Sequence, residues 1–456
     1  MIRLIFLLVA FLLVAIVRAK IGYFWHITDI HYDVSYSTKG DPRKNCWKAN
    51  GVPNRRPGTF GDYYCDSPWA LVESAAKAMR AKHGDNLEFV LWTGDGLSGT
   101  ASGRSSDMQV LALQNLTNLL SKTFPSQFVF PVLGHNDPGS SPGERLGYKD
   151  VGQFWRQWLP TEAINSFNKG GYYTIEQKEH KLRIVALNTN LYSGQYSSED
   201  PLGQWKWLDC VLTTSRKRKE TVFLVGHMAP GADERQPEAL PTFQEKHSLR
   251  LLRTIRENSD IIVGQFYGHL HSDTFRVIYN DLGRPVNWML LAPALSPKRT
   301  ASGPNNPGIR LYKFETSTGQ VLDYTQYYLD LNNANQRDSA DWQQEYNLTS
   351  YYGLTEVTAK SLNELASTFT KHNSQLFSRY YEANSVRLYG SPEAGGCHAS
   401  CAQTHYCAIT RVEYSEFRNC LEAAASALAS PASMPLMSSI PVVIISQLLA
   451  YYMSVT

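Results

Sequence analysis

The segment Gly22–Asp33 reads GYFWHITDIHYD, a run of apolar and aromatic residues that ends in the pattern Asp29-Ile30-His31. Such a run predicts a buried β-strand. Alternate side chains of an extended chain face the same side, so Asp29 and His31 are expected to converge where the strand ends. Carboxylate oxygens and imidazole nitrogens are ligands for zinc and related divalent cations. The segment therefore predicts a strand that ends at a metal site.

The same arrangement, a short apolar run followed by polar residues, recurs along the chain. The runs are LEFVLWTGDG (87–96), FVFPVLGHND (128–137), TVFLVGH (221–227) and IIVGQFYGHLHSD (261–273). Each pattern is weak by itself, but several strand ends that all carry metal-ligating residue types form a strong signal. The predicted metal ligands are Asp29, His31, Asp95, His135, His227, His269 and His271.

Segments with apolar residues at helical spacing lie between the predicted strands. The clearest are SPWALVESAAKAMRAKHG (67–84) and SDMQVLALQNLTNLLSK (106–122). A mixture of strands and helices throughout the chain favours a layered α/β or α+β fold. From about residue 340 the sequence becomes helix-like and carries cysteines. We therefore predict a main domain at 20–339 and a C-terminal helical, disulfide-bearing subdomain at 340–421.

Both ends of the chain have the composition of processed segments. Residues 1–19 combine the basic Arg3, an apolar run and the small Ala19, which is typical of a secretory signal peptide. A retained membrane anchor is the alternative, although the apolar run is shorter than a membrane span requires. Residues 422–456 contain small residues, a short spacer and an apolar tail, the order of a glycosylphosphatidylinositol (GPI) attachment signal, with attachment expected within 423–430. A single-span anchor is the rival interpretation. The expected location is the extracellular face of the plasma membrane, or secretion.

The cysteines fit an oxidising compartment. The chain has seven, and their clustering predicts a Cys46–Cys65 disulfide and two disulfides among the C-terminal four, Cys397, Cys401, Cys407 and Cys420. Cys210 is left unpaired and is interpreted as a small buried hydrophobic residue. Asn115 and Asn347 begin Asn-Leu-Thr sequons, which predict glycosylation sites on an exported protein.

The charge balance excludes one class of partner. Lys and Arg total 44 against 41 Asp and Glu, so the chain offers no strongly basic field for a nucleic-acid polymer. The sequence does not indicate an oligomeric state.

The ordered patterns resemble those of the calcineurin-like metallophosphoesterases, which carry D-x-H, G-D, G-N-H-D or G-N-H-E, a later histidine and G-H-x-H. The stretches GDYYCDSPWAL (61–71), LNTNLY (187–192), QWKWL (204–208), GQFYGHLHSD (264–273) and NNPGIRLY (305–312) narrow the resemblance to the acid sphingomyelinase-like phosphodiesterases, over about residues 22–421. With its predicted lipid-anchor tail, the chain is most similar to the lipid-anchored members of this family.

The resemblance implies a fold, a cofactor and a substrate class. The fold is a four-layer α/β sandwich, in which two central mixed β-sheets are flanked by helices. The cofactor is two Zn²⁺ ions, one held by Asp29, His31 and His271 and the other by His227 and His269, with Asp95 bridging them. The substrate is a small phosphodiester of nucleotide or phospholipid-headgroup type.

Two residues depart from the family pattern. The G-N-H-D motif reads G-H-N-D here, so His135 occupies the metal-binding position and Asn136 the position of the histidine that protonates the leaving group. A carboxamide donates hydrogen bonds but delivers no proton near neutral pH. Gly99 stands where relatives of this family carry a further histidine that faces the substrate phosphate. Asp137 keeps its place, where it would orient the neighbouring histidine.

These departures leave two alternatives open. In the first, the chain is a zinc-dependent phosphodiesterase weakened by loss of the acid, or one in which a turned backbone lets His135 and Asn136 exchange roles. In the second, the chain is a catalytically impaired cell-surface protein that keeps the fold and acts by binding lipids or membrane proteins. The intact metal ligands favour the enzyme, because buried ligands without a metal are costly.

Overall fold

The computed structural model describes residues 20–429, apart from the segments 49–52, 54, 85, 101–104, 140–145, 178–179, 195, 299–302, 391, 393–395 and 398. The predicted signal peptide and the apolar C-terminal tail lie outside the described residues. Within them, no helix is both long enough and apolar enough to cross a membrane.

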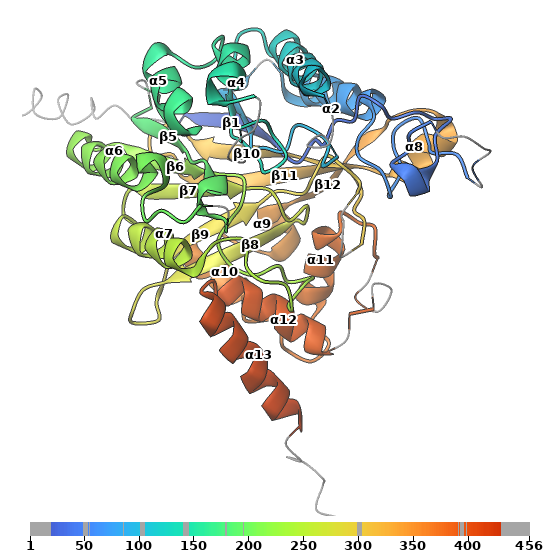
Figure 1. The fold of residues 1–456 in the computed structure, drawn as a ribbon. Coiled ribbons are helices and arrows are strands. Elements are labelled where there is room, and N and C mark those ends of the chain that lie inside the picture. The colour runs from blue at the N-terminus through green and yellow to red at the C-terminus, as the bar shows by residue number, and fades with distance from the viewer. Residues whose placement is uncertain are drawn as a thin grey trace, which may run out of the picture.

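Two six-stranded mixed sheets form the centre of the molecule (Figure 1). The first sheet has the order β12-β11-β10-β1-β2-β3 and the second has the order β4-β5-β6-β7-β9-β8. The strands of the first sheet are β1 (Ile21–Ile27), β2 (Phe89–Trp92), β3 (Phe128–Pro131), β10 (Gly308–Glu315), β11 (Val321–Leu329) and β12 (Trp342–Asn347). The strands of the second are β4 (Tyr173–Gln177), β5 (Leu182–Ala186), β6 (Thr221–Val225), β7 (Ile262–Tyr267), β8 (Thr274–Tyr279) and β9 (Pro285–Leu291).

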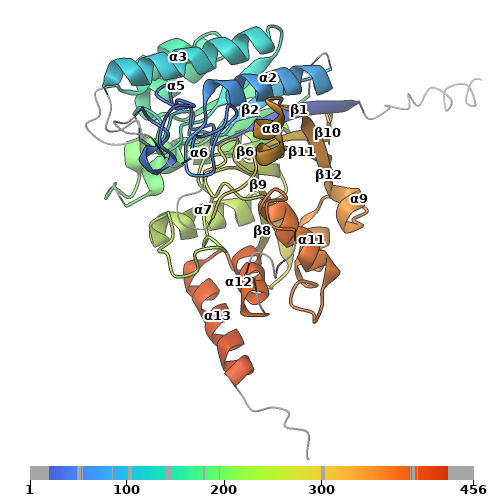
Figure 2. The same ribbon diagram turned by 90° about the vertical axis from the view of Figure 1, so that its right-hand side faces the viewer.

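Helices cover the outer faces of both sheets and complete four layers (Figures 1 and 2). Those beside the first sheet are α2 (Trp69–His83), α3 (Ser106–Thr123) and α4 (Tyr148–Trp155), whereas the neighbouring α5 (Thr161–Gly170) packs against β4 of the second sheet. Those that pack on the second sheet include α6 (Gln204–Arg218), α7 (Glu245–Glu257), α10 (Ala359–Ala366) and α12 (Ala399–Thr410). The predicted α/β sandwich of two central sheets flanked by helices is confirmed.

Aromatic side chains fill the space between the two sheets. Phe24 of β1 is fully buried, and its ring centroid lies 4.8 Å from that of Phe89 in the same sheet. The Phe24 centroid also lies 5.7 Å from that of Phe223 and 5.3 Å from that of Phe266, both in the second sheet. Phe24 of β1 therefore lies at the contact between the two sheets.

The C-terminal region differs in part from its predicted helical character. Residues 342–347 form strand β12, which pairs antiparallel with β11 at the edge of the first sheet, so the helical prediction is wrong there. Beyond β12 the region is helical, with α9 (Leu348–Tyr352), α10, α11 (Gln375–Asn384), α12 and α13 (Tyr414–Ala429). The predicted domain boundary at 340 stays a prediction.

The predicted disulfide framework is confirmed. Cys46 bonds Cys65, Cys397 bonds Cys401, and Cys407 bonds Cys420. Among the described residues Cys210 forms no disulfide, as predicted, but it is exposed on α6. The interpretation of Cys210 as a buried hydrophobic residue is therefore wrong.

Replacing Phe24 with alanine should lower the free energy of unfolding by about 3–5 kcal/mol, because a fully buried aromatic ring is lost from the contact between the sheets. Chemical denaturation followed by tryptophan fluorescence measures this change. The matched control is Phe128→Ala, since Phe128 is 52% exposed at the start of β3 and should cost about 1 kcal/mol or less. Equal losses for the two variants would contradict the central role of Phe24.

Candidate metal centre

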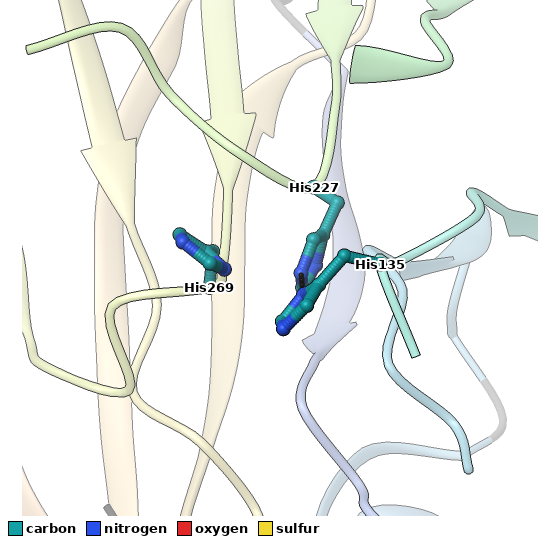
Figure 3. Close-up of side chains that lie close together, drawn as sticks. All are labelled: His135, His227 and His269. Atoms are coloured by element: carbon teal, nitrogen blue, oxygen red, sulfur yellow. Dashed lines mark hydrogen bonds between the residues drawn. The ribbon is translucent and has the colours of Figure 1, made fainter. Parts of the chain in front are cut away.

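The loops that follow β1, β2, β3, β6 and β7 bring the predicted ligands together. β1, β2 and β3 run parallel in the first sheet, and β6 and β7 run parallel in the second, so their carboxyl ends lie at one edge of each sheet. Figure 3 shows His135, His227 and His269 converging from three of these loops. The seven predicted ligands, called the ligand cluster below, are Asp29, His31, Asp95, His135, His227, His269 and His271.

The first group of the ligand cluster contains Asp29, His31 and His271, each with a donor atom within 4.8 Å of the others. The Nε2 atoms of His31 and His271 are 3.0 Å apart, and His271 Nε2 is 3.4 Å from Asp29 Oδ1. Asp29 Oδ1 is buried and has no hydrogen-bond partner among the described residues. A buried carboxylate oxygen that faces two imidazole nitrogens matches the ligand set of a divalent cation.

The second group contains His135, His227 and His269, also with donor atoms within 4.8 Å of one another. His135 Nδ1 lies 3.1 Å from His227 Nε2 (Figure 3). The fully buried Asp95 stands between the two groups, because its Oδ2 is 3.5 Å from both His31 Nε2 and His227 Nε2. Asp95 therefore has the position of a ligand shared by two cations.

Backbone carbonyls fix the ring orientation of two histidines. His271 Nδ1 lies 2.8 Å from the carbonyl oxygen of Lys298, and His227 Nδ1 lies 2.8 Å from that of Thr93. Because a carbonyl oxygen only accepts, each Nδ1 carries the proton and donates it. In the neutral ring each Nε2 then carries the lone pair, directed at the ligand cluster, as metal binding requires.

Asp29 and His31 converge for a reason different from the one the sequence suggested. β1 ends at Ile27, and both residues have left-handed backbone, with φ of 49° and 46°. Asp95, His269 and His271 also have positive φ, of 49°, 69° and 57°. Residues with side chains rarely adopt this conformation, and it concentrates at functional sites. The side chains therefore meet through tight turns and not through strand alternation.

His135 and Asn136 both approach the carboxylate of Asp95. His135 Nδ1 is 3.0 Å from Asp95 Oδ2, although 46% of the His135 side chain is exposed. Asn136 donates its backbone N–H to Asp95 Oδ1 (2.8 Å) and its side-chain amide to Oδ2 (2.7 Å). Sequence position placed Asn136 over the leaving group, with an exchange of roles with His135 as the alternative. In the structure Asn136 also reaches the carboxylate of Asp95.

Asp137 holds two of these loops together. Its carboxylate accepts hydrogen bonds from the backbone N–H groups of Gly134, Gly96 and Leu97, at 2.8, 2.8 and 3.2 Å. Burial raises the pKa of Asp137 to about 6, with a further contribution from the charge of Asp95. Asp137 thus fixes the loop after β3 against the loop after β2, whereas the sequence suggested that it orients the neighbouring side chain.

A hollow of about 320 Å³ opens beside the ligand cluster. Ligand-cluster residues and Asn136 form part of its wall, and a Cβ atom added to Gly99 would come nearest to Asn136 Oδ1, at 3.7 Å. The remaining lining residues were not predicted as site residues from the sequence, and they include Asp66, Asp233, Gln236 and Lys298. Asp66 lies within the quoted stretch GDYYCDSPWAL, which was the one signal that pointed to it.

The charges within the ligand cluster are strongly coupled. Burial by itself would lower the pKa of His31 and His227, but the facing carboxylates, Asp29 for His31 and Asp95 for both, raise each pKa to about 9. Burial would raise the pKa of Asp95, yet the charges of His135 and His227 hold it well below its usual value. Without a cation, the protonated imidazoles of His31 and His227 therefore balance the charge of the ionised carboxylates, and a metal ion must displace those protons.

Two sequence-family models match the chain. The model of calcineurin-like phosphoesterases matches residues 22–273, and the model of the acid sphingomyelin phosphodiesterase C-terminal region matches residues 284–427. Human acid sphingomyelinase-like phosphodiesterase 3b (Homo sapiens) is 35% identical over 422 residues, which cover 89% of this chain and 91% of that protein. The chain belongs to the acid sphingomyelinase-like phosphodiesterases.

Other relatives of this phosphodiesterase carry related names. Cyclic GMP-AMP phosphodiesterase SMPDL3A of Bos taurus is 36% identical over 414 residues, which cover 88% of this chain and 90% of that protein. Sphingomyelinase phosphodiesterase C of Dictyostelium discoideum is 32% identical over 425 residues, with coverage of 88% and 93%. The predicted enzyme class, a metal-dependent phosphodiester hydrolase, is confirmed by this membership. The identities do not separate the 3b type from the SMPDL3A type.

The ligand cluster of this phosphodiesterase fits the divalent metal centre of its family. The fit rests on the buried Asp29 Oδ1 without a described hydrogen-bond partner, on the inward-facing lone pairs of His227 and His271, and on the shared position of Asp95. These donors come from both sheets and enclose the positions where cations would lie.

The two predicted glycosylation sites of the phosphodiesterase are partly buried. Asn115 lies inside α3, and its side chain hydrogen-bonds the phenol of Tyr32. Asn347 ends β12 and donates its amide to Thr325 Oγ1 at 3.1 Å. Glycosylation at either residue stays a prediction.

After metal is removed with a chelator, the phosphodiesterase should become less stable as the pH rises from 6.5 to 9.5. The folded-state pKa of His31 and of His227 is about 9, above the unfolded value of 6.5. Their protonation therefore stabilises the folded state fully below pH 6.5, and this contribution is lost as the pH rises through 9. Thermal unfolding at fixed ionic strength measures the trend.

The same series on zinc-loaded protein is the control. Zinc binds the neutral imidazoles, so its affinity and the melting temperature should hold or rise over this pH range. If the melting temperature of the chelated protein stays constant between pH 6.5 and 9.5, the raised pKa of His31 and of His227 is contradicted.

Proposed function

We propose that this chain is an exported, membrane-anchored, zinc-dependent phosphodiesterase that hydrolyses small phosphodiesters of nucleotide or phospholipid-headgroup type. The observation that carries the proposal is the position of Asp95, whose Oδ2 is equidistant from His31 Nε2 and His227 Nε2 at 3.5 Å. That geometry supports a pair of cations sharing one carboxylate. When bound, such a pair neutralises phosphate charge and activates a water molecule as the nucleophile.

The donor types in the ligand cluster support zinc. Five of its seven members are histidines and two are aspartates, as the residues named above show. Imidazole nitrogens suit zinc, whereas magnesium and calcium prefer oxygen ligands. Asp29, His31 and His271 would hold one ion, and His135, His227 and His269 the other, with Asp95 shared.

The chain's own residues are poorly suited to protonate the leaving group. Asn136 lines the hollow, but its side-chain amide donates to Asp95 and has no proton to deliver near neutral pH. His135 contacts Asp95, which commits its Nδ1 to the ligand cluster. Hydrolysis should therefore be slower than with the order Asn-His, because general acid catalysis contributes about 10²- to 10⁴-fold.

The substrate class rests on the names of relatives. One is named a cyclic GMP-AMP phosphodiesterase and another a sphingomyelinase phosphodiesterase, and both names describe enzymes that act on phosphodiesters of small organic groups. A hollow of about 320 Å³ admits a ligand of that size.

Export and anchoring are supported by the disulfides and by the position of the C-terminal helix. Three disulfides fit an oxidising compartment outside the cytosol. Helix α13 projects away from the sheets in both ribbon views, and its C-terminal half contains residues 423–429 of the predicted attachment segment (Figures 1 and 2). A lipid attached there would stand clear of the phosphodiesterase fold.

The reciprocal double variant His135→Asn/Asn136→His tests the catalytic proposal. Wild-type protein should hydrolyse a dinucleoside monophosphate, whose alkoxide leaving group requires a proton, only when zinc is present, and the double variant should be faster by up to about 10²- to 10⁴-fold because an acid is restored. Steady-state kinetics with zinc content measured in parallel checks both statements.

Asp95→Asn is the matched control, since it removes the shared carboxylate and should abolish turnover in either background. Equal rates for wild type and double variant would show that the residue order is tolerated. Turnover by the double variant alone would favour a catalytically impaired cell-surface protein that acts by binding.

Anchoring is tested on cells that express the full chain. Phosphatidylinositol-specific phospholipase C should release the protein from the cell surface into the medium, because that enzyme cleaves the lipid from a GPI anchor. The control is a chain truncated after residue 421, which should be secreted without treatment. Surface protein that resists the phospholipase but remains membrane-bound would identify a single-span anchor instead.

A further inference from the structure

The hollow beside the ligand cluster contains an ammonium group that the metal chemistry does not use. Lys298 lines the hollow together with Asp66, Gly99 and Asn136. The side chain of Lys298 is 20% exposed, so it is largely removed from solvent but reaches the hollow. A lysine is rarely this buried without a partner or a function.

Asp66 holds the ammonium group of Lys298 next to position 99. Lys298 Nζ lies 3.5 Å from Asp66 Oδ1. The other oxygen, Oδ2, accepts a hydrogen bond from the backbone N–H of Gly99 at 3.1 Å and from Ser98 Oγ at 2.6 Å. One carboxylate therefore joins the ammonium group to the loop that follows β2.

Position 99 carries a glycine, whereas the family resemblance leads us to expect a histidine there. Gly99 leaves open space, since a Cβ atom there would come no closer than 3.7 Å to Asn136. Lys298 Nζ and the backbone N–H of Gly99 thus contact the same carboxylate, and both residues line the hollow. An ammonium group is a point charge with three donors, which suits phosphate oxygens.

The backbone of Lys298 ties this cation to the ligand cluster. Its carbonyl oxygen accepts the Nδ1–H of His271 at 2.8 Å, so Lys298 cannot shift without disturbing a predicted metal ligand. The backbone of Lys298 is consequently fixed next to the ligand cluster, and its side chain lines the hollow with the ammonium group paired to Asp66.

We propose that Lys298 contacts the substrate directly and that its ammonium group binds a non-bridging oxygen of the phosphodiester. The ion pair with Asp66 positions the group, and its remaining donors face the hollow. Lys298 thereby supplies the positive contact that Gly99 and Asn136 do not. This assignment rests on the proposed function, because it requires a phosphate group to enter the hollow.

Binding of inorganic phosphate to the zinc-loaded protein tests the assignment without requiring turnover. Isothermal titration calorimetry should show that Lys298→Met weakens phosphate binding about 10-fold or more, as expected for loss of a hydrogen bond between charged groups. Lys298→Gln should behave in the same way, and Lys298→Arg, which keeps the charge, should restore most of the affinity. Zinc content should equal that of wild type in every variant.

Lys246→Met is the matched control. It also removes one lysine charge, but Lys246 lies on α7 and forms its ion pair with Glu199 at the surface. It should leave phosphate affinity unchanged. Unchanged affinity in zinc-loaded Lys298→Met or Lys298→Gln overturns the assignment, and so does a wild-type protein that binds zinc but no phosphate. If wild type binds phosphate through Lys298 yet hydrolyses no diester, the proposed function fails while this contact stands.

Discussion

The buried carboxylate of Asp95 is the constraint on which the rest of the centre depends. Its Oδ2 faces His31, His135 and His227, and its two oxygens each accept a hydrogen bond from Asn136. Residues from the loops after β1, β3 and β6 are therefore all placed relative to this one group. A carboxylate removed from water costs several kcal/mol unless cations or donors surround it. Asp95, like Asp29, therefore requires a surrounding positive charge. Both residues also have left-handed backbone, a local strain that the stability of the two sheets must offset.

Sequence reasoning located the ligand cluster because its signal is chemical. Aspartate and histidine at the ends of apolar runs are uncommon enough that several together identify a metal centre, and the three disulfides followed from clustering of the cysteines. Backbone turns leave no such signal, so the positive φ of Asp29 and His31 could not be predicted. The lining of the hollow could not be predicted either, because Asp66 and Lys298 are separated by more than two hundred residues and meet only in the folded chain.

Strand β12 shows how periodicity misleads. Its sequence is WQQEYN, in which Trp342 and Tyr346 are buried and the intervening glutamines are exposed. Two apolar residues four apart lie on one face of a helix, but they also lie on one face of a strand, because four is an even number. β12 is at the edge of its sheet, where polar residues are tolerated, so composition did not decide between the two. The pair His135 and Asn136 is a similar case, since a tight turn brings both to Asp95 although sequence position suggested separate roles.

The division of the ligand cluster between the two sheets gives metal supply a role in protein maturation. Asp29, His31, Asp95 and His135 follow strands of the first sheet, whereas His227, His269 and His271 follow strands of the second. A cation can bind both sets of ligands only after the two sheets have docked. Because it binds the docked state and not the separated one, it stabilises the docked state by mass action. The half-life of the newly made chain should thus follow the free concentration of the divalent metal that it binds. Cells short of that metal would lose this protein through quality control before they lost its activity through an empty site.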